Sequence, residues 1–194
     1  MIIVGVGVGP GMLTEEAIEA IKNAPVVYGS KRAIETAEQY ITGKANKIRD
    51  YKNLHLLPDD AVILSTGDPL FSGLGKYASK NDRIIPGISS LHLACARLGV
   101  NMTNLAAITA HGRGGNHSKH LLVQELKLGK NVLLLPDASF GPNEVAEVLN
   151  ELDINADIYT CEELGYPNER ITGGNKTKPP EVQSKLYCIM IVQK

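Results

Sequence analysis

The residues best suited to chemistry lie in short glycine-rich segments, and the first of these is Val4–Gly11, with the sequence VGVGVGPG. It stands between a β-branched run and a stretch with helical spacing, where a glycine-rich backbone can approach a ligand closely. The dinucleotide fingerprint GxGxxG is excluded because Pro10 takes the place of its last glycine, and Gly29 stands where an acid would follow the second strand. A phosphate loop is excluded because no Gly-Lys-Ser or Gly-Lys-Thr follows. A simple tight turn is the alternative explanation of this segment.

Two further segments follow apolar runs in the same way. Gly67–Gly73 (GDPLFSG) comes after Ala61–Ser65 and places the carboxylate of Asp68 at the end of a predicted strand, where open sheets bind ligands. The alternative is that Asp68 only caps a following helix. Pro86–Ser90 (PGISS) has the same setting, and its serines serve either as a helix N-cap or as ligand contacts. We expect three such loops at three strand ends to converge on one pocket.

A fourth segment, His111–Lys130, concentrates positive charge, since it holds four Lys or Arg residues, three of the chain's five histidines and a single acid. His111 and Arg113 lie in its glycine-containing loop, which could close over a ligand. Arg can grip a carboxylate in bidentate fashion, and His can relay a proton near neutral pH. The alternative is a solvated basic helix face, chiefly for Lys127 and Lys130. No metal site is expected, because no carboxylate or thiolate accompanies the histidines.

Strand patterns and helix patterns alternate along the chain and predict an α/β fold, largely a parallel sheet covered on both faces. Two lobes are expected, residues 1–104 and residues 105–194. The predicted strands are Ile2–Val6, Val26–Tyr28, Ala61–Ser65, Arg83–Ile85, Leu105–Thr109, Asn131–Leu135, Ala156–Thr160 and Lys185–Val192, the last of them antiparallel. The predicted helices are Thr14–Asn23, Lys31–Ile41, Ser90–Leu98, Lys119–Leu128 and Pro142–Leu152, and Gly173–Pro180 is predicted as an exposed loop.

Composition narrows the class of protein further. The 194 residues carry 20 Lys plus Arg against 21 Asp plus Glu, a balance that argues against a general nucleic-acid or membrane-surface binder. The three cysteines form no CxxC pair and no cluster with histidine, so a disulfide framework and a zinc site are not expected. This cysteine usage is typical of a reducing cytosol. No apolar run is long enough for a membrane span, and glycines interrupt the apolar start as they would not in a signal peptide. We therefore expect a cytoplasmic protein.

Together the four segments resemble the tetrapyrrole (corrin/porphyrin) methyltransferase family, whose members transfer a methyl group from S-adenosylmethionine. The resemblance covers essentially the whole chain and includes Glu169–Ile171 (ERI) in the second half. Within the family, Ala110–Arg113 (AHGR) is similar to the members that methylate carbon 5 of cobalt-precorrin-7 in cobalamin biosynthesis.

The resemblance implies a two-lobed fold, with a mainly parallel sheet in the first lobe, a mixed sheet in the second and the active site in the cleft between them. It also implies a homodimer. Contact with the enzyme that methylates and decarboxylates at carbon 15 is a separate expectation, and the reaction itself calls for no metal on the protein. By motif position the residues at the cofactor would be Val8, Pro10, Gly67, Asp68, Phe71, Ser89, Ser90, Leu91, Leu135 and Pro136. His111 and Arg113 would serve the corrinoid substrate, as carboxylate contacts or as a proton relay.

The expected reaction is an in-line displacement, in which no acid need assist the departure of the neutral thioether. Positioning can supply roughly 7–11 kcal/mol, so no nucleophilic residue is expected on the protein. Three alternatives stay open from the sequence. The same cofactor site could act at another ring position or on a protein or RNA acceptor. The chain could be a cofactor-binding subunit that needs a partner methyltransferase. It could also be an α/β protein that binds phosphate or nucleotides.

Overall fold

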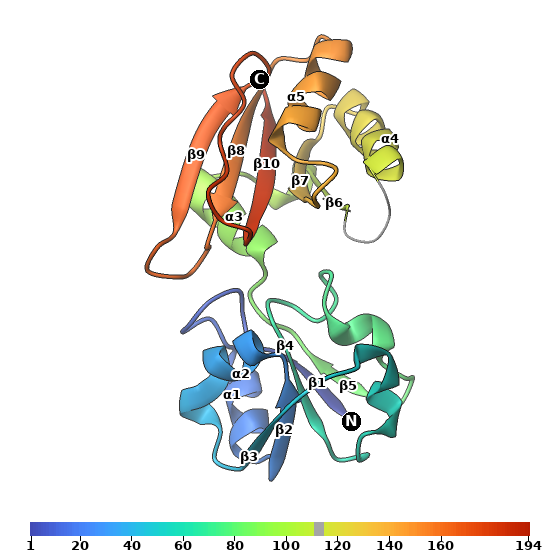
Figure 1. Ribbon diagram of the computed structural model, residues 1–194, viewed down its shortest axis with the longest axis vertical. Helices are drawn as coiled ribbons and strands as arrows, with labels where there is room; N and C mark the ends of the chain where they lie inside the picture. The colour runs from blue at the N-terminus through green and yellow to red at the C-terminus, as the bar shows by residue number, and fades with distance from the viewer. Residues whose placement is uncertain (111–114) are drawn as a thin grey trace. The chain divides into compact units, whose positions relative to one another are not determined.

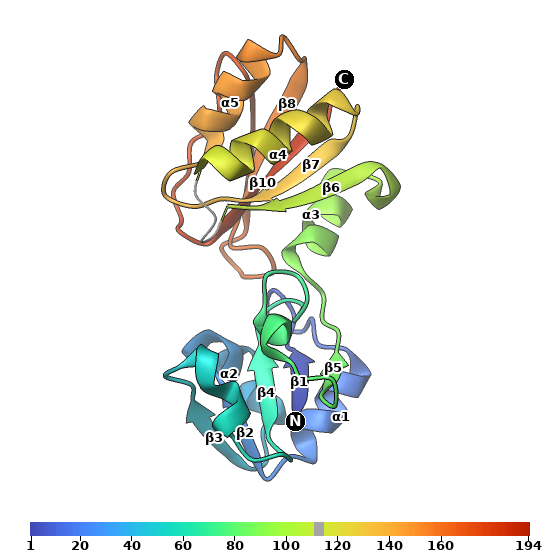
Figure 2. The ribbon, with the colours of Figure 1, turned by 90° about the vertical axis from the view of Figure 1, so that its right-hand side faces the viewer.

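The structure, a computed structural model, describes residues 1–110 and 115–194, and the chain divides between Ser90 and Leu91 into two units (Figures 1 and 2). The first unit is built on one parallel sheet, with the strand order β3-β2-β4-β1-β5. Its strands are β1 (Ile2–Gly5), β2 (Val26–Gly29), β3 (Lys44–Lys47), β4 (Val62–Ser65) and β5 (Arg83–Ile85). Its helices are α1 (Glu15–Lys22) and α2 (Lys31–Ala37), with 3₁₀ turns η1 (Glu38–Tyr40), η2 (Tyr51–Leu56) and η3 (Leu74–Tyr77).

Both faces of this sheet are covered, as predicted. Successive strand residues point to opposite faces, so Val4 and Leu64 pack with α1 and α2, while Ile3 and Ile63 pack on the other side. There the cover comes from the segments around η2 and η3, with Leu54 among the buried side chains. Because all five strands run parallel, their carboxyl ends share one edge of the sheet.

Local sequence signals explain where the elements begin. The Thr14 hydroxyl accepts a hydrogen bond from the Ala17 N–H (3.1 Å), and two glutamates occupy the first turn of α1. Ser30 caps α2 in the same way, accepting from the Ala33 N–H at 3.1 Å. The predicted helix over 31–41 is shorter than expected, because regular α-helix ends at Ala37 and continues as a 3₁₀ turn.

The second unit is a mixed five-stranded sheet with the order β6-β7-β10-β8-β9, in which only β6 and β7 are parallel. Its strands are β6 (Leu105–Thr109), β7 (Asn131–Leu135), β8 (Ala156–Glu162), β9 (Arg170–Asn175) and β10 (Tyr187–Gln193). Its helices are α3 (Ser90–Leu98), α4 (Gly115–Lys127) and α5 (Pro142–Glu151), with the 3₁₀ turn η4 (Met102–Asn104). Helices α4 and α5 lie side by side against the sheet (Figure 2), and Leu122 and Leu149 join Leu134 and Ile189 in the core between them.

Three features differ from the sequence-based expectation. Strand β3 was not predicted, because its residues (KANK) are polar and lack the alternation of a half-buried strand. Strand β9 runs into the predicted exposed loop, and its Gly173 lies opposite Tyr159, whose ring would be 3.1 Å from a β-carbon there. The division of the units comes before α3 rather than near residue 104. From Leu91 on, helix α3 falls in the second unit, where its Arg97 pairs with Glu169 (2.6 Å). No helix in the described part of the chain is both long and apolar enough to cross a membrane.

Candidate functional site

Three loops meet in the first unit at the carboxyl ends of β1, β4 and β5. Gly7 and Gly67 form an antiparallel bridge, in which each N–H donates to the other's carbonyl oxygen (3.2 and 2.8 Å). The N–H of Val8 donates to the carbonyl oxygen of Ile88 at 2.8 Å and so ties the first loop to the third. The three glycine-containing loops therefore lie in direct contact with one another.

The glycines are needed because the three backbones touch. A β-carbon at Gly87 would lie 2.3 Å from the carbonyl oxygen of Gly67, and one at Gly5 would lie 2.5 Å from the amide nitrogen of Gly87. Gly7 and Gly67 also have positive φ angles of 79° and 67°, a backbone region that residues other than glycine rarely adopt. Much of the glycine pattern thus serves contact between loops rather than contact with a ligand.

Asp68 holds two of these loops together. Its Oδ1 accepts from the Leu70 N–H (2.8 Å), which closes its own turn, and its Oδ2 accepts from the Gly87 N–H (3.1 Å). No regular helix follows, since the next helical turn begins at Leu74 with Gly73 before it, so Asp68 is not a helix cap. The structure gives this carboxylate a positioning role within the loops.

The other predicted cofactor residues around these loops lie on them or at the start of α3. Val8 and Phe71 are half-buried, Pro10 is exposed, and Ser89 is buried directly before α3, which begins with Ser90 and Leu91. Sequence reasoning missed two exposed apolar side chains on these loops, Leu70 (70 % exposed) and Ile88 (39 % exposed). Their signal was a large apolar residue within a segment that is rich in glycine, proline and polar residues.

The remaining predicted site residues lie elsewhere. Leu135 ends β7 in the second unit, where its carbonyl oxygen accepts from the Ala110 N–H (2.8 Å), and Pro136 follows it as a buried residue. His111 and Arg113 lie outside the described residues. The roles of these four residues stay predictions.

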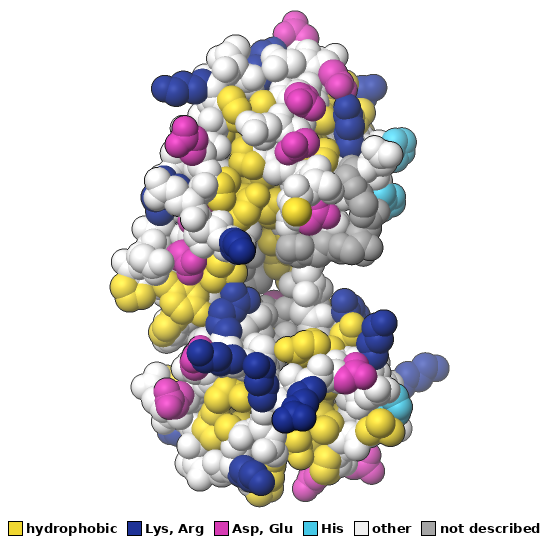
Figure 3. All heavy atoms as spheres, in the orientation of Figure 1, with side chains coloured by type: hydrophobic (Ala, Val, Ile, Leu, Met, Phe, Trp, Pro, Cys, Tyr) yellow, Lys and Arg dark blue, Asp and Glu magenta, His cyan; other side chains and the backbone are white. Residues whose placement is uncertain are grey.

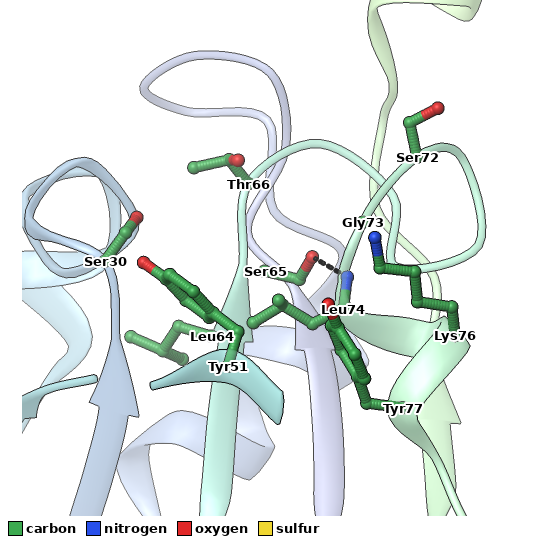
Figure 4. Close-up of a pocket in the computed structure, with 10 residues that line it drawn as sticks. All are labelled: Ser30, Tyr51, Leu64, Ser65, Thr66, Ser72, Gly73, Leu74, Lys76 and Tyr77. Carbon is green, nitrogen blue, oxygen red and sulfur yellow. Dashed lines mark hydrogen bonds between the residues drawn. The ribbon is translucent and has the colours of Figure 1, made fainter. Parts of the chain in front are cut away.

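A hollow of about 230 Å³ opens beside the Asp68 loop, at the ends of β2 and β4 (Figure 4). It was not predicted, because its residues come from four separate segments and form no motif. Its lining consists of Ser30, Tyr51, Leu64, Ser65, Thr66, Ser72, Gly73, Leu74, Lys76 and Tyr77. The buried Ser65 shapes its floor, since its hydroxyl oxygen accepts from the Leu74 N–H at 3.2 Å (Figure 4).

In the second unit, Glu169 of the ERI segment joins two elements. Its Oε1 accepts from the Nε of Arg97 on α3 (2.6 Å), and its Oε2 accepts from the Gly165 N–H (2.7 Å). Burial alone would raise the pKa of this carboxyl, but the hydrogen bonds from Arg97 and Gly165 together with the Arg97 charge outweigh it and hold the pKa below its ordinary value. Glu169 is therefore a carboxylate at neutral pH and fastens α3 to the turn before β9.

The described residues offer neither a metal site nor an activated thiol. Among residues 1–110 and 115–194, no group of three or more His, Cys, Asp or Glu side chains could hold a metal ion. Cys95, Cys161 and Cys188 are buried free thiols, the last two opposite each other on β8 and β10. The hydrogen bond with Cys161, followed by burial, raises the pKa of Cys188 well above its ordinary value. A protonated, buried thiol is not a nucleophile.

Comparison with known proteins gives one consistent family. The chain matches the Tetrapyrrole (Corrin/Porphyrin) Methylases over residues 2–178. It is 38% identical to the probable cobalt-precorrin-7 C(5)-methyltransferase of Methanocaldococcus jannaschii over 186 residues, with 86% of each chain covered. It is 33% identical to a decarboxylating precorrin-6Y C(5,15)-methyltransferase of a Sinorhizobium species, and there 88% of this chain covers 43% of the longer relative.

Solved structures agree with this result. The precorrin-6Y methylase of Archaeoglobus fulgidus, described as a cobalamin biosynthesis protein, superposes with a TM-score of 0.77 at 29% identity, covering 100% of this chain and 98% of that one. A uroporphyrin-III C-methyltransferase of Thermus thermophilus, solved with S-adenosylhomocysteine, gives a TM-score of 0.76 at 21% identity, covering 97% and 90%. The second of these likenesses concerns the fold alone.

Proposed function

The chain belongs to the tetrapyrrole (corrin/porphyrin) methylase family, and we propose that it transfers a methyl group from S-adenosylmethionine to carbon 5 of cobalt-precorrin-7, giving cobalt-precorrin-8 in cobalamin biosynthesis. The main support for this choice of substrate is the 38% identity, over 86% of both chains, to the relative named as a probable cobalt-precorrin-7 C(5)-methyltransferase. The shared family and the fold support methyl transfer itself.

The first unit fits such a cofactor at its three converging loops. Their backbones are in mutual contact at Gly5, Gly67 and Gly87, so the surface that they form is fixed before any ligand arrives. The exposed side chains of Leu70 and Ile88 offer apolar contact to a ligand with both apolar and polar parts. We assign the cofactor to these loops, with Asp68 holding their geometry. Leu135 and Pro136 are proposed as further cofactor contacts on the ground of their motif position alone.

When bound, S-adenosylmethionine supplies an electrophilic methyl group on a positively charged sulfur. The protein's task is then to hold an electron-rich ring carbon in line with that methyl group. Transfer would form the new carbon–carbon bond as the carbon–sulfur bond breaks, with its electron pair staying on neutral S-adenosylhomocysteine, and the positive charge passed to the ring would be removed by loss of a proton from it. Orientation of this kind is worth roughly 7–11 kcal/mol in well-ordered reactions, so no nucleophilic side chain is required.

Arg113 and His111 are proposed to serve the substrate. A guanidinium can bind a carboxylate of the corrinoid in bidentate fashion, and an imidazole can accept or relay a proton near neutral pH. Both residues belong to the AHGR segment, which the sequence resemblance links to carbon 5.

We further propose a cytoplasmic homodimer that can associate with the carbon-15 methyltransferase. Buried free thiols such as Cys161 and Cys188 suit a reducing compartment. The association is supported by the relative that joins carbon-5 and carbon-15 activities in its name, of which this chain spans 43%. Size-exclusion chromatography with light scattering, alone and with the carbon-15 enzyme, tests both points.

Mass spectrometry tests the reaction. Cobalt-precorrin-7 is incubated with the protein and with S-adenosylmethionine that carries a deuterated methyl group. We expect the corrinoid to gain the mass of one labelled methyl group. If S-adenosylhomocysteine binds to the protein but the corrinoid gains no mass, the substrate assignment is wrong, and other tetrapyrroles and a partner enzyme become the next assays.

A further inference from the structure

The hollow beside the Asp68 loop has the size of a substituent rather than that of a whole ligand. Its volume of about 230 Å³ is below the roughly 300–1,000 Å³ of pockets that enclose a drug-sized molecule. It lies at the carboxyl ends of β2 and β4, the edge of the sheet where open α/β folds bind ligands. A tetrapyrrole ring system cannot enter it, but a side chain of the ring can.

The charge around the hollow is positive. Lys76 is exposed and lies over the ring of Tyr77, with its Nζ 5.0 Å from the ring centroid, and among the described residues no carboxylate lies within 4.0 Å of that nitrogen. Arg32 donates from Nη2 to the Thr66 hydroxyl (3.2 Å) and likewise has no carboxylate partner in the described part of the chain. The lining residues include no Asp and no Glu. In Figure 3, Lys and Arg side chains gather on the visible face of the first unit.

Two tyrosines give the hollow fixed walls and hydrogen-bond donors. Tyr51 and Tyr77 are half-buried, and their rings pack against the apolar cluster of Ile3 and Ile63. In Figure 4 the hydroxyl end of Tyr51 points toward Ser30, and that of Tyr77 points toward Leu74. Within the described residues neither phenol forms a hydrogen bond, so both remain available to a ligand.

We propose that this hollow binds a carboxylate-bearing side chain of the tetrapyrrole substrate, with Lys76 as its counter-charge and Tyr51 and Tyr77 as its walls and donors. The proposal rests on the proposed function, because it concerns how the same substrate is held. Lys76 lies in η3, directly after the Asp68 loop, so the segment that holds the cofactor loops together leads into the turn that carries the cation. Binding one side chain of the ring here would fix which ring carbon faces the methyl group.

The test compares Lys76→Gln with wild type in two assays. The first is the KM for cobalt-precorrin-7, and the second is the dissociation constant for uroporphyrin III, a tetrapyrrole with eight carboxylates, measured by calorimetry without cofactor. We expect Lys76→Gln to raise both the KM and the dissociation constant about tenfold, because one charge-assisted hydrogen bond is lost. The variant's binding should also be less sensitive to salt, because one charge is removed. Lys76→Arg is expected to restore most of the affinity. The affinity for S-adenosylhomocysteine is expected to stay within about twofold in every variant, which also reports that the protein is folded.

Lys80→Gln is the matched control, because Lys80 is an exposed lysine of the same unit that does not line the hollow. If Lys76→Gln changes the two constants no more than Lys80→Gln does, the proposal is wrong, even where methyl transfer to cobalt-precorrin-7 is observed. If wild type binds uroporphyrin III in a manner that depends on Lys76 but does not methylate cobalt-precorrin-7, the assignment of the hollow as a carboxylate site is supported and the proposed function is wrong. If wild type binds neither compound, both are overturned.

Discussion

Replacing Gly87 with alanine tests whether contact between the loop backbones builds the cofactor site. The new β-carbon would lie 2.3 Å from the carbonyl oxygen of Gly67 and 2.9 Å from the carbonyl carbon of Gly5. Both neighbours are backbone, so the loops must move apart by about 1 Å to reach ordinary van der Waals separation. A shift of this size cannot keep both the 3.1 Å bond from the Gly87 N–H to Asp68 and the 2.8 Å bond from Val8 to Ile88.

Such forced insertions cost typically 1–3 kcal/mol, so Gly87→Ala should lower the free energy of unfolding by about that amount. The affinity for S-adenosylhomocysteine, measured by titration calorimetry, should fall by roughly 10- to 100-fold, which corresponds to about 1.4–2.8 kcal/mol. Gly141→Ala is the matched control, because a β-carbon there meets only ordinary contacts, at 3.4 Å from the Tyr187 hydroxyl oxygen and 3.5 Å from Glu144. Wild-type affinity in a folded Gly87→Ala protein would refute the assignment of the cofactor to these loops.

Two further predictions concern single side chains. Arg113→Ala should raise the KM for the corrinoid by about tenfold, because one charged hydrogen bond to the substrate is lost, and it should leave the cofactor affinity unchanged. A collapse of the cofactor affinity would show that Arg113 contacts the cofactor and not the corrinoid. Glu169→Gln should lower the melting temperature at pH 7, since it weakens the bonds to Arg97 and Gly165. The pKa of Glu169 in the folded protein lies below its ordinary value of 4.5, so the stability from this carboxylate is present above that pH and is lost as pH falls through the lowered pKa. The difference in melting temperature between variant and wild type should therefore shrink below about pH 4.5 and stay constant from pH 6 to 8, and a constant difference down to pH 3 would contradict this role.

The sequence predicted the parts of the fold that rest on local patterns. Buried strands such as Val62–Ser65 and capped helices such as Glu15–Lys22 were found because apolar periodicity and capping residues act over a few positions. Strand β3 escaped because its place at the sheet edge depends on pairing with β2, which a polar run does not reveal. The strand at Gly173 escaped because glycine there serves a contact with Tyr159 from β8.

For the candidate site, the sequence predicted the individual loops but not the contacts that join them. The three loops were found because glycine and proline directly after a buried strand leave a local pattern, and their contact follows from parallel strands sharing one edge. The bond from Gly87 to Asp68 could not be foreseen, because it joins two loops far apart in the sequence. The hollow around Lys76 was missed for the same reason, since Tyr51 and Ser30 reach it from other segments.

The position of the new methyl group tests the central claim most directly. The product of the reaction with S-adenosylmethionine labelled with carbon-13 at its methyl group would be purified, and the label would be located by two-dimensional NMR. We predict a single labelled methyl group on carbon 5 of the corrin ring. A label on any other ring carbon would contradict the substrate assignment, and an unlabelled corrinoid would contradict the proposed reaction.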